Sequence, residues 1–108
     1  MIARTWHGAV PAEKADAYFD YLLQTGVPGL KGTKGNLGVY VLRRIEGSRA
    51  HFFMISLWES REAIRAFAGD DIERARYYPE DAEFLLALQP QVTHYEVLLG
   101  PEHELPTG

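Results

Sequence analysis

Side chains suited to binding and proton transfer stand two residues apart near both ends of the chain: Arg4 and Trp6, then His94 and Glu96. Both segments alternate like β-strands, so the two members of each pair share one face. If the first and last strands are antiparallel neighbours with Arg4 opposite Glu96, Trp6 lies opposite His94. In that arrangement Arg4 can stabilise an oxyanion and His94 can serve as a general base. The alternative is an ordinary cross-strand ion pair on a half-solvated face.

A shift of this register by one residue would send these groups to opposite faces and bring His7 towards His94. Two histidines can begin a metal site, but no third ligand is evident by spacing. Even a catalytic zinc normally has three protein ligands. We therefore predict no bound metal.

A second polar and aromatic patch spans residues 70–78, which read Asp-Asp-Ile-Glu-Arg-Ala-Arg-Tyr-Tyr. Tyr77 and Tyr78 precede Pro79, which biases the backbone away from helix, so both phenols can point inward. Buried tyrosines usually need a hydrogen-bond partner, which makes them natural ligand-orienting groups. We expect Tyr77 to hold a ligand and Tyr78 to help enclose it. A core aromatic cluster beneath a loop is the alternative.

The overall properties of the chain exclude several classes of function. It has 108 residues, a net charge of −4 and no cysteine, so disulfides, thiolate metal sites and thiol nucleophiles are excluded. The basic residues are scattered, unlike the basic stripe of a nucleic-acid-binding protein. No apolar run approaches the roughly 20 residues that cross a bilayer, and the N-terminus lacks signal-peptide features. We expect no membrane partner and a cytoplasmic location. No phosphate-binding loop, dinucleotide fingerprint or Ser-His-Asp arrangement is visible.

Hydrophobic periodicity and turn residues predict the elements that must position these side chains. Expected strands cover residues 2–9, 37–45, 50–58 and 92–99, with a hairpin turn at 46–49. Expected helices cover residues 12–25, 60–68 and a short stretch at 79–88, with one or two helical turns at 70–77. Residues 26–35 are expected to form a loop because of their glycines and proline.

This βαββα(αα)β order predicts an α+β, ferredoxin-like domain over residues 1–99, with a four-stranded antiparallel sheet and a loose tail over 100–108. Large apolar residues occur at both parities of the two central strands, so both sheet faces need cover. A homodimer that packs two sheets face to face would provide it, with Val39 and Val41 as candidates for the buried positions. A monomer with an amphipathic open face is the alternative.

Four segments resemble the antibiotic-biosynthesis-monooxygenase superfamily: residues 2–6, 57–60, 67–70 and 92–97. The second of them is the Leu-Trp-Glu-Ser corner between a strand and a helix. The resemblance implies a dimeric α+β barrel with a cavity between sheet and helices in each subunit. It also implies oxidation of an aromatic, polyketide-like substrate by oxygen without a dedicated cofactor. Trp6, Phe67, Tyr77 and Tyr78 would then form the cavity walls, together with Arg4, His94 and Glu96.

The same superfamily has a haem-degrading branch, and its signature residues are missing here. The alignment puts Phe67 where that branch has a tryptophan, Tyr77 where it has the haem-ligating histidine, and Trp6 at or near its asparagine. Because a tyrosine can ligate ferric haem, haem stays possible as a cofactor. Two other classes also stay open on this fold: a lyase or isomerase, and a non-catalytic, stress-related dimer that binds a small ligand.

Overall fold

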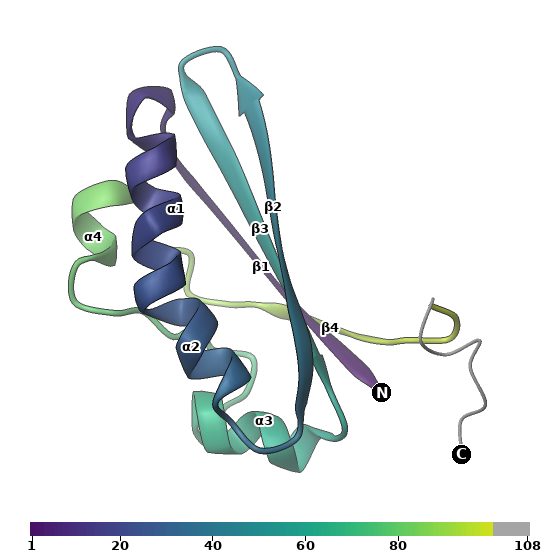
Figure 1. The fold of residues 1–108 in the computed structure, drawn as a ribbon. Coiled ribbons are helices and arrows are strands. Elements are labelled where there is room, and N and C mark those ends of the chain that lie inside the picture. Colours follow the sequence, from purple (N-terminus) through teal and green to yellow (C-terminus); the bar gives the residue numbers. More distant parts are fainter. Residues whose placement is uncertain (101–108) are drawn as a thin grey trace.

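A computed structural model describes residues 1–100 of the chain (Figure 1). The predicted tail, residues 100–108, lies outside the described part except for Gly100. The elements follow in the order β1 (Ile2–Pro11), a 3-10 turn (Ala12–Lys14), α1 (Ala15–Gln24), α2 (Gly26–Lys31), β2 (Asn36–Glu46), β3 (Arg49–Trp58), α3 (Arg61–Ala68), α4 (Asp81–Phe84) and β4 (Thr93–Glu96).

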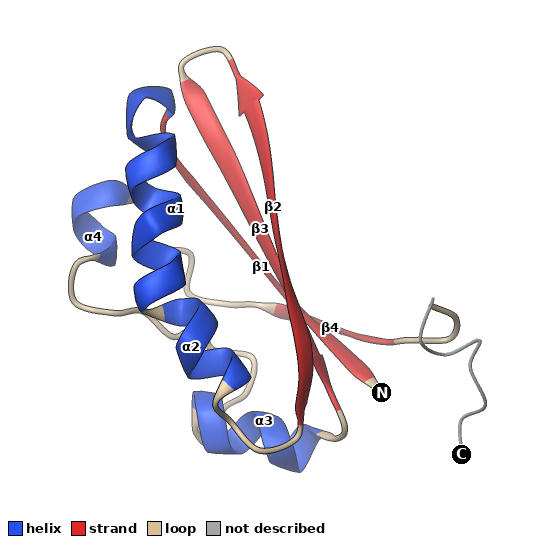
Figure 2. Cartoon of the chain, in the orientation of Figure 1, coloured by secondary structure: helices blue, strands red, loops and turns tan. Residues whose placement is uncertain are grey.

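The four strands form one antiparallel sheet in the order β2-β3-β1-β4. All helices lie on one face of this sheet, and the other face is uncovered (Figure 2). This arrangement confirms the predicted ferredoxin-like fold. No helix in residues 1–100 is long and apolar enough to span a membrane.

Local sequence explains the two sharpest corners of the chain. The hairpin between β2 and β3 turns at Gly47, whose φ of +59° suits glycine. The side chain of Ser60 caps α3 by accepting a hydrogen bond of 3.2 Å from the backbone N–H of Ala63. The helix ends at Gly69, with φ +91°. The predicted start and end of this helix are therefore confirmed.

The core lies between the sheet and the helices. Its largest fully buried side chains come from strands and helices alike: Val10, Tyr18, Phe52, Trp58 and Ile64. Because side chains alternate along a strand, β3 directs every second residue from Ala50 to Trp58 into this layer. The helical layer and the sheet together enclose the candidate site.

Two segments differ from the predicted secondary structure. Residues 26–31 form α2, because Pro28 stands in the first turn, where its missing N–H loses no helical hydrogen bond. Residues 70–77 contain no helix. Their backbone bonds across to another segment instead, with the N–H of Ala75 donating to Pro90 and the N–H of Val92 donating to Glu73, both at 2.8 Å.

The last predicted elements are shorter than expected. The helix predicted over residues 79–88 shrinks to α4, which ends as the chain turns extended at Leu85. The strand predicted over 92–99 is regular only over β4, where it pairs with β1.

The uncovered sheet face is rich in large apolar side chains. Tyr40, Leu42, Phe53 and Tyr95 are each 44–56% exposed there. Val39 and Val41 point the other way: they pair with Ser56 and Met54 of β3 and pack against the core beneath the helices. Val39 and Val41 were predicted to face the dimer partner, and this prediction is wrong because they face the helices.

Candidate functional site

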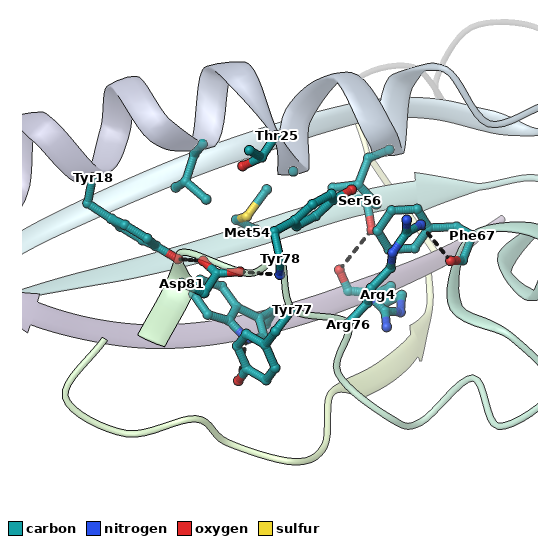
Figure 3. Close-up of a pocket in the computed structure, with 14 residues that line it drawn as sticks. Arg4, Tyr18, Thr25, Met54, Ser56, Phe67, Arg76, Tyr77, Tyr78 and Asp81 are labelled. Atoms are coloured by element: carbon teal, nitrogen blue, oxygen red, sulfur yellow. Dashed lines mark hydrogen bonds between the residues drawn. The ribbon is translucent and has the colours of Figure 1, made fainter. Parts of the chain in front are cut away.

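A cavity lies between the sheet and the helical layer, where α1, α2 and α3 meet the segment that leads into α4 (Figure 3). About 40 Å³ of it is open to water-sized molecules, which is room for a few waters. An aromatic ligand must therefore displace side chains as it enters. The sheet contributes Arg4, Trp6, Met54 and Ser56; the helices contribute Tyr18, Leu22, Thr25, Gly26, Leu30 and Phe67; the segment before α4 and its first residue contribute Arg76, Tyr77, Tyr78 and Asp81.

Arg4 brings a positive charge from β1 into this cavity, and only 6% of its surface is exposed to solvent. Its Nη2 donates a 3.0 Å hydrogen bond to the backbone oxygen of Arg74, while its Nε is buried without a partner. No ion pair within residues 1–100 involves Arg4. Burial lowers the pKa of this guanidinium from 12.5 to about 10. A buried cation without a counter-ion is a good site for an anion.

Phe67 stands between two guanidinium groups at the same end of the cavity. The Cζ atom of Arg4 lies 5.5 Å from the Phe67 ring centre, and that of Arg76 lies 4.8 Å from it. Arg76 also stacks over the Tyr78 ring at 5.1 Å and donates a 3.0 Å hydrogen bond to the Phe67 backbone oxygen. The Phe67 ring therefore contacts two of the cations that line the cavity.

Trp6 and Tyr77 form a short hydrogen-bonded chain along the cavity wall. The indole Nε1 of Trp6 donates to the Tyr77 hydroxyl at 3.2 Å, and that hydroxyl donates to the Gln89 backbone oxygen at 2.6 Å. The two rings meet edge to face with centres 6.2 Å apart. Burial is the main cause that raises the pKa of Tyr77. Because its proton is already donated, Tyr77 serves chiefly to position Trp6 and the segment around Gln89.

Asp81 and Tyr18 form the opposite, acidic end of the cavity (Figure 3). Asp81 is 5% exposed, and its carboxylate accepts from the Tyr18 hydroxyl at 3.0 Å and from the backbone N–H of Tyr78 at 2.7 Å. Burial and the neighbouring Asp81 charge raise the pKa of Tyr18. Sequence reasoning missed this pair and Arg76. An acidic residue near a helix start normally suggests a solvated group, and only the apolar periodicity around Tyr18 hinted at burial.

The structure brings five of the seven predicted site residues together: Arg4, Trp6, Phe67, Tyr77 and Tyr78 line one cavity. Tyr78 also packs closely over Gly29 of α2, where a Cβ atom would collide with its hydroxyl.

The two remaining predicted residues, His94 and Glu96, do not line the cavity. The predicted pairing of Arg4 with Glu96 is wrong by two residues: Arg4 lies opposite His94, and Glu96 lies opposite Ile2 and is exposed. His94 sits beside Arg4 with both ring nitrogens buried and unpartnered. Burial first, and then the charges of Arg4 and Arg61, lower its pKa.

His7 lies on the opposite, uncovered sheet face and so does not approach His94. Its Nε2 is 3.0 Å from Nδ1 of His51, and the two rings stack with centres 5.2 Å apart. Within residues 1–100, no group of three potential metal-ligating side chains occurs.

Comparison with known proteins places this fold and cavity in a wider context. The sequence model of the antibiotic biosynthesis monooxygenase family matches residues 1–75. A candidate antibiotic biosynthesis monooxygenase from Nitrosomonas europaea has a TM-score of 0.63 at 17% identity, over 92% of this chain and 100% of that one. The haem degrader MhuD from Mycobacterium tuberculosis, solved with two haems in its active site, has a TM-score of 0.61 at 22% identity, over 93% and 98%. No curated protein matches the chain.

Proposed function

The chain belongs to the antibiotic biosynthesis monooxygenase family, and we propose that it oxidises a small aromatic phenol or enol with molecular oxygen. The reaction would take place in the cavity between sheet and helices, without a dedicated cofactor. One observation carries this proposal: the buried guanidinium of Arg4 faces an aromatic cavity and has no counter-ion among residues 1–100. An ionised substrate supplies the missing negative charge.

Ionisation also supplies the chemistry. A phenolate or enolate is a much better electron donor than its neutral form, so it can reduce oxygen directly. The substrate anion transfers one electron to oxygen, and the resulting radical and superoxide combine at a ring carbon that still carries a hydrogen. The peroxide anion takes up the proton released when the substrate ionised and becomes a carbon-bound hydroperoxide. Loss of water from this intermediate leaves a carbonyl. One oxygen atom thus enters the product and the other leaves as water, with no external reductant. Arg4 favours the anion, as a fixed positive charge does for a developing oxyanion.

The remaining cavity residues take supporting roles in this proposal. Trp6, Phe67 and Tyr78 enclose the ring of the substrate, and Tyr77 keeps Trp6 in place. Asp81 is the carboxylate that lines the cavity, at the end opposite Arg4. It can accept a proton from the ring carbon that lies across the ring from the oxygen held by Arg4. His94 is the neighbour of Arg4 on β4 and does not line the cavity.

We also propose that the chain is a homodimer in which the uncovered sheet faces pack together. The support is the exposed set of Tyr40, Leu42, Phe53 and Tyr95 on that face. Monomers rarely leave apolar patches of this kind in water, and a twofold pair would bury the patch on both copies.

Haem is less well supported as the ligand of this cavity. MhuD binds haem, but its identity to this chain is 22%. Within the described residues, no histidine lines the cavity, and the Tyr77 hydroxyl already donates to Gln89. This donor set does not fit an iron ligand, so we derive no step through haem. A Soret band shifted on titration with haemin would reverse this judgement.

Oxygen uptake with a panel of anthrones and naphthols, in the presence of a metal chelator, tests the proposed reaction. We expect uptake above the spontaneous rate, insensitive to the chelator. Arg4→Gln should lower it by at least tenfold. Arg43→Gln is the matched control, because Arg43 forms a solvent-exposed ion pair with Asp16 far from the cavity. Uptake that never exceeds the spontaneous rate, or equal rates for Arg4→Gln and the wild type, would contradict the proposal.

A further inference from the structure

Unpartnered buried polar atoms concentrate at one place in the molecule. Four such side-chain atoms occur in residues 1–100, and three of them belong to Arg4 and His94: Nε of the first, Nδ1 and Nε2 of the second. Arg4 and His94 are direct partners across β1 and β4, so their side chains leave the same face of the sheet side by side. We call this pair the Arg4–His94 corner. Because buried polar atoms are normally satisfied, the corner lacks hydrogen-bond partners, among them an acceptor for the Nε–H of Arg4.

The charges around the corner indicate that the missing acceptor is an anion. Arg4 and Arg61 both act on His94 and lower its pKa, and only Glu73 acts in the opposite direction. Arg76 adds another guanidinium, which also contacts the Phe67 ring. A water molecule would satisfy one or two donors but would leave the buried charge of Arg4 uncompensated.

Arg4 presents its N–H donors to the cavity as a planar fork, and its Nε–H has no partner. His94 lies beside Arg4 on β4 without lining the cavity, and its neutral ring has one donor and one acceptor nitrogen. A carboxylate has two acceptor oxygens that match the fork of Arg4, and it binds guanidinium through charge-assisted hydrogen bonds. At the far end of the cavity, Asp81 offers an acceptor in place of a donor. The cavity is therefore polarised, with donors at one end and a carboxylate at the other.

We propose that the ligand of this cavity is an aromatic hydroxy acid, whose carboxylate binds at the Arg4–His94 corner. This inference rests on the proposed function only in using the same cavity. The hydroxyl that is oxidised lies on the same ring, within the field of Arg4 and Arg76. A neutral polyketide-like phenol would leave the buried charge of Arg4 uncompensated and is therefore the poorer ligand.

Anaerobic calorimetry with a matched pair of probes tests this assignment, because binding is then measured without turnover. The acid is 1-hydroxy-2-naphthoate, and its methyl ester has nearly the same shape without the charge. We expect the wild-type protein to bind the acid at least tenfold more tightly than the ester. Arg4→Gln should remove most of this preference, and His94→Leu should reduce it several-fold. Arg43→Gln should retain it.

Equal binding of acid and ester by the wild type would overturn the inference, as would an unchanged preference in Arg4→Gln. If Arg4→Gln does not fold, Arg4→Lys replaces it: the charge stays but the planar fork is lost, and the preference should fall without vanishing. Oxygen uptake separates the two proposals. A preference for the acid without any oxygen consumption overturns the proposed function alone, and oxidation of phenols and acids alike, with equal affinities, overturns this inference alone.

Discussion

Replacing the buried cation of the cavity by an apolar side chain of similar length should abolish ligand binding at little cost in stability. The variant is Arg4→Met. If Arg4 serves the fold, this substitution lowers the free energy of unfolding. If Arg4 serves a ligand, the substitution removes binding and leaves stability nearly unchanged. The magnitudes can be set out from the contacts of Arg4.

Burial disfavours the charged guanidinium in the folded protein. Its pKa falls from 12.5 to about 10, and at about 1.36 kcal/mol per pKa unit this lowering disfavours the charged form by about 3 kcal/mol. At neutral pH the guanidinium is charged in both the folded and unfolded states, so the whole penalty applies. Methionine removes it.

Two favourable contacts are lost in the same substitution. The charged hydrogen bond to the Arg74 oxygen contributes about 1.5–3 kcal/mol, and the contact with the Phe67 ring contributes about 0.5–2 kcal/mol. Gains and losses nearly cancel, so we expect the free energy of unfolding to change by about 1 kcal/mol or less.

Urea unfolding followed by tryptophan fluorescence measures this change, and calorimetry on the same sample measures binding. A loss of more than about 3 kcal/mol would refute the reasoning, because Arg4 would then be holding the 70–77 segment in place. Retained binding of the aromatic acid at wild-type affinity would refute it independently.

Three further outcomes follow from other contacts. Tyr18→Phe removes the buried hydrogen bond to Asp81 and should lower the free energy of unfolding by about 1.5–3 kcal/mol. A change below about 0.5 kcal/mol in urea unfolding would show that the bond contributes nothing. Phe53→Asp places a charge on the uncovered sheet face and should convert the dimer into monomer in sedimentation experiments. If the wild type already sediments as a 12.2 kDa monomer at micromolar concentration, the dimer proposal is wrong. Burial and the charge of Arg4 lower the pKa of His94, so the unfolded chain binds the His94 proton more readily than the folded one. The free energy of unfolding should therefore fall as the pH drops below about 6.5. His94→Leu should make this decline shallower, and an unchanged pH profile of stability would contradict the burial of His94.

The sequence contained enough information for the fold because its signals there are local. The alternation in the strands, the Ser60 cap and the glycine at Gly69 each act within a few residues, and they predicted the hairpin and α3 correctly. The helix α2 escaped prediction because Gly and Pro are read as breakers, although Pro28 is harmless in a first turn.

The candidate site was only partly predictable because its key contacts join distant segments. Tyr18 and Asp81 are 63 positions apart, and no local sequence pattern predicts their contact. The pairing of Arg4 was predicted with Glu96 in place of His94. A register error of two residues leaves each side chain on its correct face of the sheet. Arg4 and Trp6 were therefore predicted on the correct face, but the cross-strand partner of Arg4 was predicted wrongly.

A crystal structure of the protein with 1-hydroxy-2-naphthoate tests the central claim most directly. We predict the aromatic ring inside the cavity between sheet and helices, with an oxygen of the ligand within hydrogen-bonding distance of Arg4 and with Tyr78 displaced from Gly29. An empty cavity, or a ligand bound only on the uncovered sheet face, would contradict the assignment of this cavity as the functional site.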